Sequence, residues 1–238
     1  MPTIVSRDEW LVARKALLIK EKEHMRAGDR LSAERRALPW VEVDKEYVFD
    51  TPDGKKTLAD LFEGRSQLIV HHLMYHPDWD AACAGCSFQA DHIDGPGQHL
   101  AHHDVRIVAV SRAPLAKLEA YKRRMGWRFD WASSDGSDFN YDFHVSFTRE
   151  QLEHGKVEYN YGLVDGYDEL PGVSVFRKDQ DGQVFHTYST YARGLDAILG
   201  GNHYLDLTPQ GRSDEDYPDW PRRHDEYADE GSRQSSVA

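Results

Sequence analysis

The chain holds only two cysteines, Cys83 and Cys86, separated by two residues. They follow residues 68–74, an apolar run that predicts a buried strand, and they precede residues 87–93, which can open a helix. The thiols are therefore expected at a strand-to-helix junction. The first N–H groups of a helix are unpaired and carry positive partial charge, which favours a thiolate there. This pattern predicts Cys83 as an ionised nucleophile and Cys86, one turn later, as its resolving partner.

Two other interpretations of the pair remain open. Unpaired cysteine is among the most buried residue types, so both thiols could be small core residues. Histidines also cluster around the pair in sequence, and thiolate with imidazole is a donor set that zinc and Cu(I) accept. The alternative hypothesis is therefore a copper- or zinc-binding module without redox turnover. Its ligands would be both cysteines with one or two of four histidines: His76, His92, His144 and His186.

Residues near the thiols are candidates for supporting roles. His71 and His72 lie in the predicted strand, and successive strand residues face opposite sides of the sheet. Because a sheet of this kind is covered on both faces, one of the two side chains must be buried beneath a covering layer. Each is either a core residue with a hydrogen-bond partner or a proton relay beneath the resolving thiol, and His76 is a third relay candidate. Trp79, four residues before Cys83, is a candidate substrate contact.

Composition narrows the class of protein. The 238 residues include 41 acidic and 29 basic side chains, and the net charge of −12 opposes attraction to nucleic acid. No apolar run is long enough to cross a membrane, and the first residues lack the pattern of a secretion signal. Two cysteines are too few for a secreted disulfide scaffold. A cytoplasmic protein is expected, with no nucleic-acid or membrane partner.

The first 40 residues predict a helical arm. Ser6 and Glu9 fit a capping box at its start, and Gly28 is expected to end the first helix before a second, shorter one. The apolar stripe of the arm is too thin for a core of its own. The arm is therefore expected to pack on the main domain or on a second subunit, and a homodimer is one expected assembly.

Residues 41–204 alternate between strand and helix patterns. This βαβαβ order predicts an α/β domain with a parallel sheet and right-handed crossovers. An aromatic-rich insertion is expected at 135–170, and turn residues at 179–182 predict a β-hairpin between two strands. Residues 205–238 are expected to be a wrapping, partly disordered acidic tail.

The order of these elements resembles the thioredoxin-like fold, a central mixed sheet flanked by helices. Residues 53–70 look like the lead-in of the alkyl hydroperoxide reductase and thiol-specific antioxidant branch. The closer resemblance is to an uncharacterised bacterial thioredoxin-like family of predicted dithiol–disulfide oxidoreductases. It rests on residues 75–79, 83–86, 185–190 and 205–212.

This resemblance implies a thiol–disulfide oxidoreductase with no bound organic cofactor. Its partners would be a protein or small-molecule disulfide and a reducing system such as thioredoxin or glutathione. It also implies that Pro171 is a cis-proline that aligns a bound disulfide in extended form. Thioredoxins typically show Trp-Cys-Gly-Pro-Cys, whereas Ala84 and Gly85 separate the thiols here. Peroxiredoxins place Thr or Ser and then Cys at positions that, after Pro77, hold Ala81 and Ala84, so the peroxidase pattern is missing.

Overall fold

The computed structural model describes residues 3–212 and 219–227 of the chain. The chain divides into two compact units, Met1–Trp40 and Val41–Ala238. The first unit is built around α1 (Arg7–Arg36), which begins with the predicted capping box of Ser6 and Glu9. The helix continues through Gly28, where a break was expected, because one glycine inside a helix costs only about 1 kcal/mol relative to alanine. No helix among the described residues is long and apolar enough to cross a membrane.

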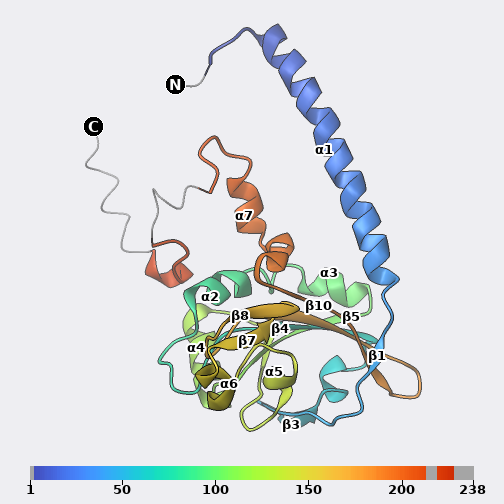
Figure 1. Ribbon diagram of the computed structural model, residues 1–238, viewed down its shortest axis with the longest axis vertical. Coiled ribbons are helices and arrows are strands. Elements are labelled where there is room, and N and C mark those ends of the chain that lie inside the picture. The colour runs from blue at the N-terminus through green and yellow to red at the C-terminus, as the bar shows by residue number, and fades with distance from the viewer. Residues whose placement is uncertain (1–2, 213–218, 228–238) are drawn as a thin grey trace. The chain divides into compact units, whose positions relative to one another are not determined.

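The second unit is organised by an eight-stranded sheet within its described part (Figure 1), with strand order β1-β10-β9-β4-β5-β6-β2-β3. The central strands β4, β5 and β6 are parallel, and β9 runs antiparallel to β4. A cysteine-bearing helix follows the central strand, which makes this a thioredoxin-like fold. The strands are β1 (Val41–Glu42), β2 (Val48–Thr51), β3 (Gly54–Thr57), β4 (Gln67–His72), β5 (Val105–Ser111), β6 (Asp130–Ser133), β9 (Gly172–Lys178) and β10 (Val184–Tyr191).

Helices cover both faces of the sheet. On one face, α2 (Ala84–Ala90) and α4 (Leu115–Met125) contribute Cys86 and Leu118 to one apolar cluster. On the other face, η1 (Asp60–Phe62) and α5 (Phe139–Asp142) contribute Phe62 and Phe139 to a second cluster. The remaining elements are α3 (Gly97–His102), α6 (Arg149–Glu153), β7 (Lys156–Tyr159), β8 (Gly162–Asp165), η2 (Ala192–Ile198), α7 (Gly200–Leu205) and η3 (His224–Glu226).

The C-terminal elements differ from the expected ones. The sequence of residues 191–199, with two glycines after it, favours a closing helix that stops at Gly200, but a 3-10 helix (η2) forms there and Gly200 and Gly201 begin α7. Gly201 is required by packing, because a Cβ there would lie 2.7 Å from the ring of Phe88. The predicted acidic tail falls partly on residues 213–218 and 228–238, which lie outside the described residues.

The topology gathers several segments at one edge of the sheet. Parallel strands β4, β5 and β6 all end at this edge. Strand β9 begins there, since His72 at the end of β4 pairs with Gly172 at the start of β9. The residues that follow β4 and those that precede β9 therefore meet at the same place.

Candidate functional site

Both cysteines lie at the start of α2. Cys83 is the N-cap residue and Cys86 belongs to the first turn. The backbone of Met74 contacts both of them: its carbonyl accepts from the Cys83 N–H at 3.1 Å, and its N–H donates to Cys86 Sγ at 3.3 Å. Cys83 is partly exposed, whereas Cys86 is 3% exposed. Cys83 is therefore the more accessible of the two cysteines.

The surroundings of the two thiols push their pKa values apart. The Cys83 sulfur lies over the first turn of α2, 3.8 Å from where a Cβ on Gly85 would stand. The pKa of Cys83 is lowered to about 6. The largest cause is a hydrogen bond from the Cys86 thiol, the N–H groups of Cys86 and Gly85 and the charge of Arg223 act in the same direction, and burial opposes them. Donation to Cys83, burial and the neighbouring negative charge raise the pKa of Cys86 well above its usual value. At neutral pH the site holds one thiolate and one thiol.

Hydrogen bonds fix the loop between β4 and α2. The ammonium of Lys117 donates to the carbonyls of Pro77 and Trp79 at 2.6 and 3.0 Å. The hydroxyl of Tyr75 donates to the carbonyl of Asp80 at 3.2 Å. Trp79 packs against the apolar cluster that contains Cys86. The predicted substrate contact is thus held close to the thiols, and its role stays a prediction.

The two strand histidines face opposite sides of the sheet. His71 is buried toward α2, where the side-chain amide of Gln89 lies 2.9 Å from its Nδ1, and burial lowers the pKa of His71 to about 4. His72 faces the other side, with its Nε2 2.8 Å from Ser174 and its ring stacked on Phe143. Burial lowers the pKa of His72 to about 3. His72 was a candidate proton relay, and this prediction is wrong, because strand alternation places His72 on the sheet face away from the thiols.

His76 lies in the loop that follows β4 and contacts neighbours through both ring nitrogens. Its Nδ1 accepts from the backbone N–H of Asp78 at 3.2 Å, and its Nε2 lies 3.4 Å from the guanidinium of Arg112. Arg112 in turn lies 3.3 Å from a carboxylate oxygen of Glu169. His76 therefore belongs to a polar chain that leads from the surface to a buried acid.

Glu169 is a site residue that the sequence interpretation missed. It is 2% exposed and is the one buried carboxylate among the described residues. The Ser146 hydroxyl donates to its Oε2 at 2.9 Å, and Oε1 has no hydrogen-bond partner among the described residues, with Arg112 as its ion-pair partner. Burial raises the pKa of Glu169 to about 7, and its charge helps to raise the pKa of Cys86. Its only signal in the sequence is its place just before the strand that pairs with β4.

Arg223 is a second residue that the sequence interpretation missed. Its Nε and Nη2 donate to the carbonyl of Ala82 at 3.2 and 2.7 Å. Ala82 immediately precedes Cys83 and is 2% exposed. The two residues are 141 positions apart in the sequence. Arg223 lies in a part of the chain that composition alone predicts to be a solvated tail.

Pro171 lies at the same sheet edge but differs from its expected geometry. The Leu170–Pro171 bond is trans, and the cis bond within the described residues is Trp220–Pro221. The N–H of Leu170 donates to Val145 at 2.9 Å, and the carbonyl of Pro171 accepts from Tyr159 at 2.7 Å. These contacts tie the segment to the insertion, and trans is the favoured form of an X–Pro bond by about 0.5–1 kcal/mol.

The alternative metal site is not assembled. Within residues 3–212 and 219–227, no three side chains of His, Cys, Asp and Glu converge on one point. His186 lies 2.7 Å from Ser189 and packs edge-on against Phe143, on the sheet face opposite α2. The sheet therefore separates His186 from both cysteines.

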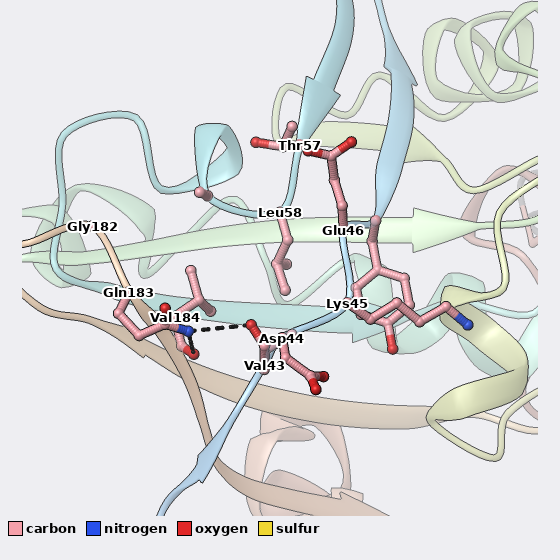
Figure 2. Close-up of a pocket in the computed structure, with 11 residues that line it drawn as sticks. Val43, Asp44, Lys45, Glu46, Thr57, Leu58, Gly182, Gln183 and Val184 are labelled. Atoms are coloured by element: carbon pink, nitrogen blue, oxygen red, sulfur yellow. Dashed lines mark hydrogen bonds between the residues drawn. The ribbon is translucent and has the colours of Figure 1, made fainter.

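Figure 2 shows the residues that line a cavity of about 200 Å³. Two of them, Tyr47 and Leu58, belong to the apolar cluster on the sheet face opposite α2. The walls of the cavity come from the segment before β2, the start of η1 and the β9–β10 turn. Gln183 narrows it by donating to the carbonyls of Val43 and Val184, both at 3.2 Å. Its lining carries no cysteine or histidine, so it holds none of the predicted redox chemistry.

The chain belongs to the family described as "Bacterial protein of unknown function (DUF899)", whose model matches residues 1–227. No curated protein matches the chain. Among solved structures, peroxidoxin BcpB from Mycobacterium tuberculosis is similar at 16% identity, covering 69% of this chain and 92% of its own with a TM-score of 0.46. Peroxiredoxin Q from Xanthomonas campestris is similar at 14% identity, covering 68% and 96% with a TM-score of 0.42.

Proposed function

We propose that this protein is a thiol–disulfide oxidoreductase in which Cys83 is the nucleophile and Cys86 the resolving thiol. One observation carries the proposal. A partly exposed sulfur at a helix start has its pKa lowered to about 6 and is hydrogen-bonded by a buried, protonated second thiol. The thiolate is the nucleophilic form of cysteine, so this arrangement separates the attacking group from the one held in reserve.

The first step is attack of the Cys83 thiolate on one sulfur of a substrate disulfide. A bond forms between Cys83 and that sulfur, the substrate S–S bond breaks, and the second substrate sulfur leaves as a thiolate that takes a proton from solvent. Before the attack, the hydrogen bond from Cys86 and the first N–H groups of α2 stabilise the negative charge of the Cys83 thiolate. Trp79 and the segment at Pro171 flank the sheet edge at which the substrate would lie.

The second step is attack of Cys86 on Cys83. Cys86 loses its proton and bonds to the Cys83 sulfur, the mixed disulfide breaks, and the bound substrate sulfur leaves as a thiolate that takes a proton from solvent. Once Cys83 is in the mixed disulfide, it no longer carries the negative charge that raises the pKa of Cys86. We assign the role of proton acceptor to Glu169, because it is buried, interacts with Cys86 and has a pKa of about 7.

The cycle closes when a dithiol, or two molecules of a monothiol, reduce the Cys83–Cys86 bond. Two electrons then pass from the reductant through the protein to the substrate disulfide, with sulfur as the only carrier. The chemistry requires no bound organic cofactor. We propose a cytoplasmic thioredoxin or glutathione system as the reductant, since free thiols persist in that compartment.

Single-turnover reaction with an aromatic disulfide that yields a coloured thiolate tests this assignment. The wild-type protein should release two coloured thiolates per chain, one at attack and one at resolution. Cys86→Ser should release one and retain a mixed disulfide detectable by mass, and Cys83→Ser should release none under native conditions. Release from Cys83→Ser at the wild-type rate would reject the assignment of the nucleophile.

A further inference from the structure

The segment Asp219–Tyr227 packs beside the thiol site, and we call it the C-terminal strap. The ring of Trp220 meets Phe88 of α2 edge-on, with centroids 5.2 Å apart. His224 Nδ1 lies 2.7 Å from the carboxylate of Asp91, where α2 ends. The strap therefore runs along the helix that carries the cysteines.

A second set of contacts holds the strap to α4. Arg124 donates to both carboxylate oxygens of Asp225, at 2.7 and 3.1 Å, and to Glu226 at 3.3 Å. These groups are partly exposed, so each pair alone contributes little, and the strap depends on them together. Changes at this clamp can release the strap without touching the thiols.

The docked strap places Arg223 against the residue before the nucleophile. Two of its nitrogens donate to the buried carbonyl of Ala82, and a third pairs with Glu226 at 2.8 Å. A buried carbonyl without a partner is costly, so this contact stabilises the backbone that leads into Cys83. The positive charge of Arg223 also lowers the pKa of Cys83.

Three elements bring polar groups to Cys83, and the loop before it carries His76, Asp78 and Asp80. From α2, Cys86 donates its thiol hydrogen. From α4, the hydroxyl of Tyr121 contacts Ser87, which donates to the Cys83 carbonyl at 2.9 Å. Arg223 comes from the strap, and its positive charge lowers the Cys83 pKa.

We infer that the C-terminal strap is a working part of the thiol site, in which Arg223 is a positioning residue that holds the Ala82 carbonyl and places a cation toward the Cys83 sulfur. The importance of this thiolate rests on the proposed function. Docking of the strap then sets how readily Cys83 ionises. Because coupling between two equilibria is reciprocal, loss of the charge on Cys83 must in turn weaken docking of the strap.

The first test measures the pH midpoint of Cys83 alkylation by iodoacetamide. Arg223→Gln should raise the midpoint by about half a pH unit or more, since an opposite charge nearby favours the ionised form. Arg223→Lys keeps the charge and loses the paired donors, so its midpoint should lie between the two. Arg222→Gln is the matched control, because Arg222 pairs with Asp219 at 2.7 Å and removing it takes the same charge from the next position. An unchanged midpoint in Arg223→Gln, or an equal shift in Arg222→Gln, overturns the inference.

The second test releases the strap from a distance. Asp225→Lys places two cations together at the α4 clamp and should raise the midpoint as Arg223→Gln does. Adding Arg124→Glu restores an opposite-charge pair and should return the midpoint toward the wild-type value. If the alkylation midpoint is the same in the wild-type protein, in Asp225→Lys and in the double variant, strap docking does not act on Cys83.

The third test reads the reciprocal effect. Cys83→Ser replaces the thiolate with a neutral group of similar size, so amide hydrogen exchange within residues 219–227 should become faster than in the wild-type protein. Exchange that stays unchanged contradicts the coupling. None of these tests requires turnover. If the midpoints shift but the protein cannot exchange disulfides, the proposed function is wrong and this inference stands. If the protein exchanges disulfides but the midpoints do not shift, this inference is wrong and the proposed function stands.

Discussion

The hydrogen bond from Cys86 to Cys83 makes a quantitative prediction for Cys86→Ala. This change removes the donor that contributes most to the lowered pKa of Cys83. A hydrogen bond to a charged group contributes at least about 1.5 kcal/mol, and we take this lowest value because a thiol is a weak donor. A free energy of about 1.4 kcal/mol corresponds to one pKa unit. The Cys83 midpoint should therefore move from about 6 in the wild-type protein to roughly one unit higher.

The two alkylation curves should cross. At pH 6 about half of wild-type Cys83 is ionised, against about one tenth in the variant. A thiolate gains nucleophilicity as its pKa rises, by roughly threefold per unit. The variant should consequently react about twofold more slowly than the wild-type protein at pH 6. At pH 8, where Cys83 is ionised in both proteins, it should react about 2.5-fold faster.

The assay is the rate of iodoacetamide incorporation against pH, with the site of the adduct located by mass spectrometry. Cys86→Ser is the control, because its hydroxyl can still donate to Cys83, and its midpoint should stay closer to the wild-type value. Parallel curves that never cross, or a wild-type midpoint near the ordinary thiol value of about 8.5, would refute the reasoning.

Further predictions concern the neighbouring groups. Gly85→Pro removes an N–H that stabilises the Cys83 thiolate, so the alkylation midpoint should rise, whereas Gly85→Ala keeps that donor and should leave it near the wild-type value. Glu169→Gln should slow the second thiolate release in the single-turnover assay by roughly 100-fold and spare the first, because glutamine cannot accept the proton of Cys86. His71 is buried neutral with a pKa lowered to about 4, so its contribution to stability is complete above its unfolded value of 6.5 and falls by about 3 kcal/mol as the pH drops to 4. Denaturant unfolding at several pH values should show a loss about 3 kcal/mol larger in the wild-type protein than in His71→Gln, which keeps the similar contribution of buried His72.

The position of the thiols was predictable because it depends on local patterns. An apolar run followed by a close cysteine pair and a helix start defines the strand-to-helix junction, and the structure places both cysteines at the beginning of α2. Capping at Ser6 and at Thr148 was predictable for the same reason, since each box joins residues three positions apart. Such features need no knowledge of distant parts of the chain.

The strand histidines show where local patterns stop. Alternation predicts that His71 and His72 face opposite sides of the sheet, but it cannot say which side carries the cysteine helix. That choice depends on the packing of α2, whose Gln89 reaches His71. The same limit applies to the metal alternative. His186 packs against Phe143 on the sheet face away from the thiols, and the spacing of residues in the sequence does not reveal the strand order that puts it there.

The two supporting groups of the site arrive through long-range packing. Glu169 lies near the end of an insertion, and its charge acts on Cys86 because β9 pairs with β4. Arg223 lies within a stretch rich in carboxylates, where composition alone predicts a solvated tail, yet its guanidinium donates to the residue before Cys83. The thiol pair thus predicts a chemistry from sequence, while the groups that shift the pKa of each thiol come from elsewhere in the chain. For Cys83 the tuning cation is carried by a strap held through partly exposed ion pairs, so the ionisation of this thiol should respond to salt more strongly than a pKa set by buried groups alone.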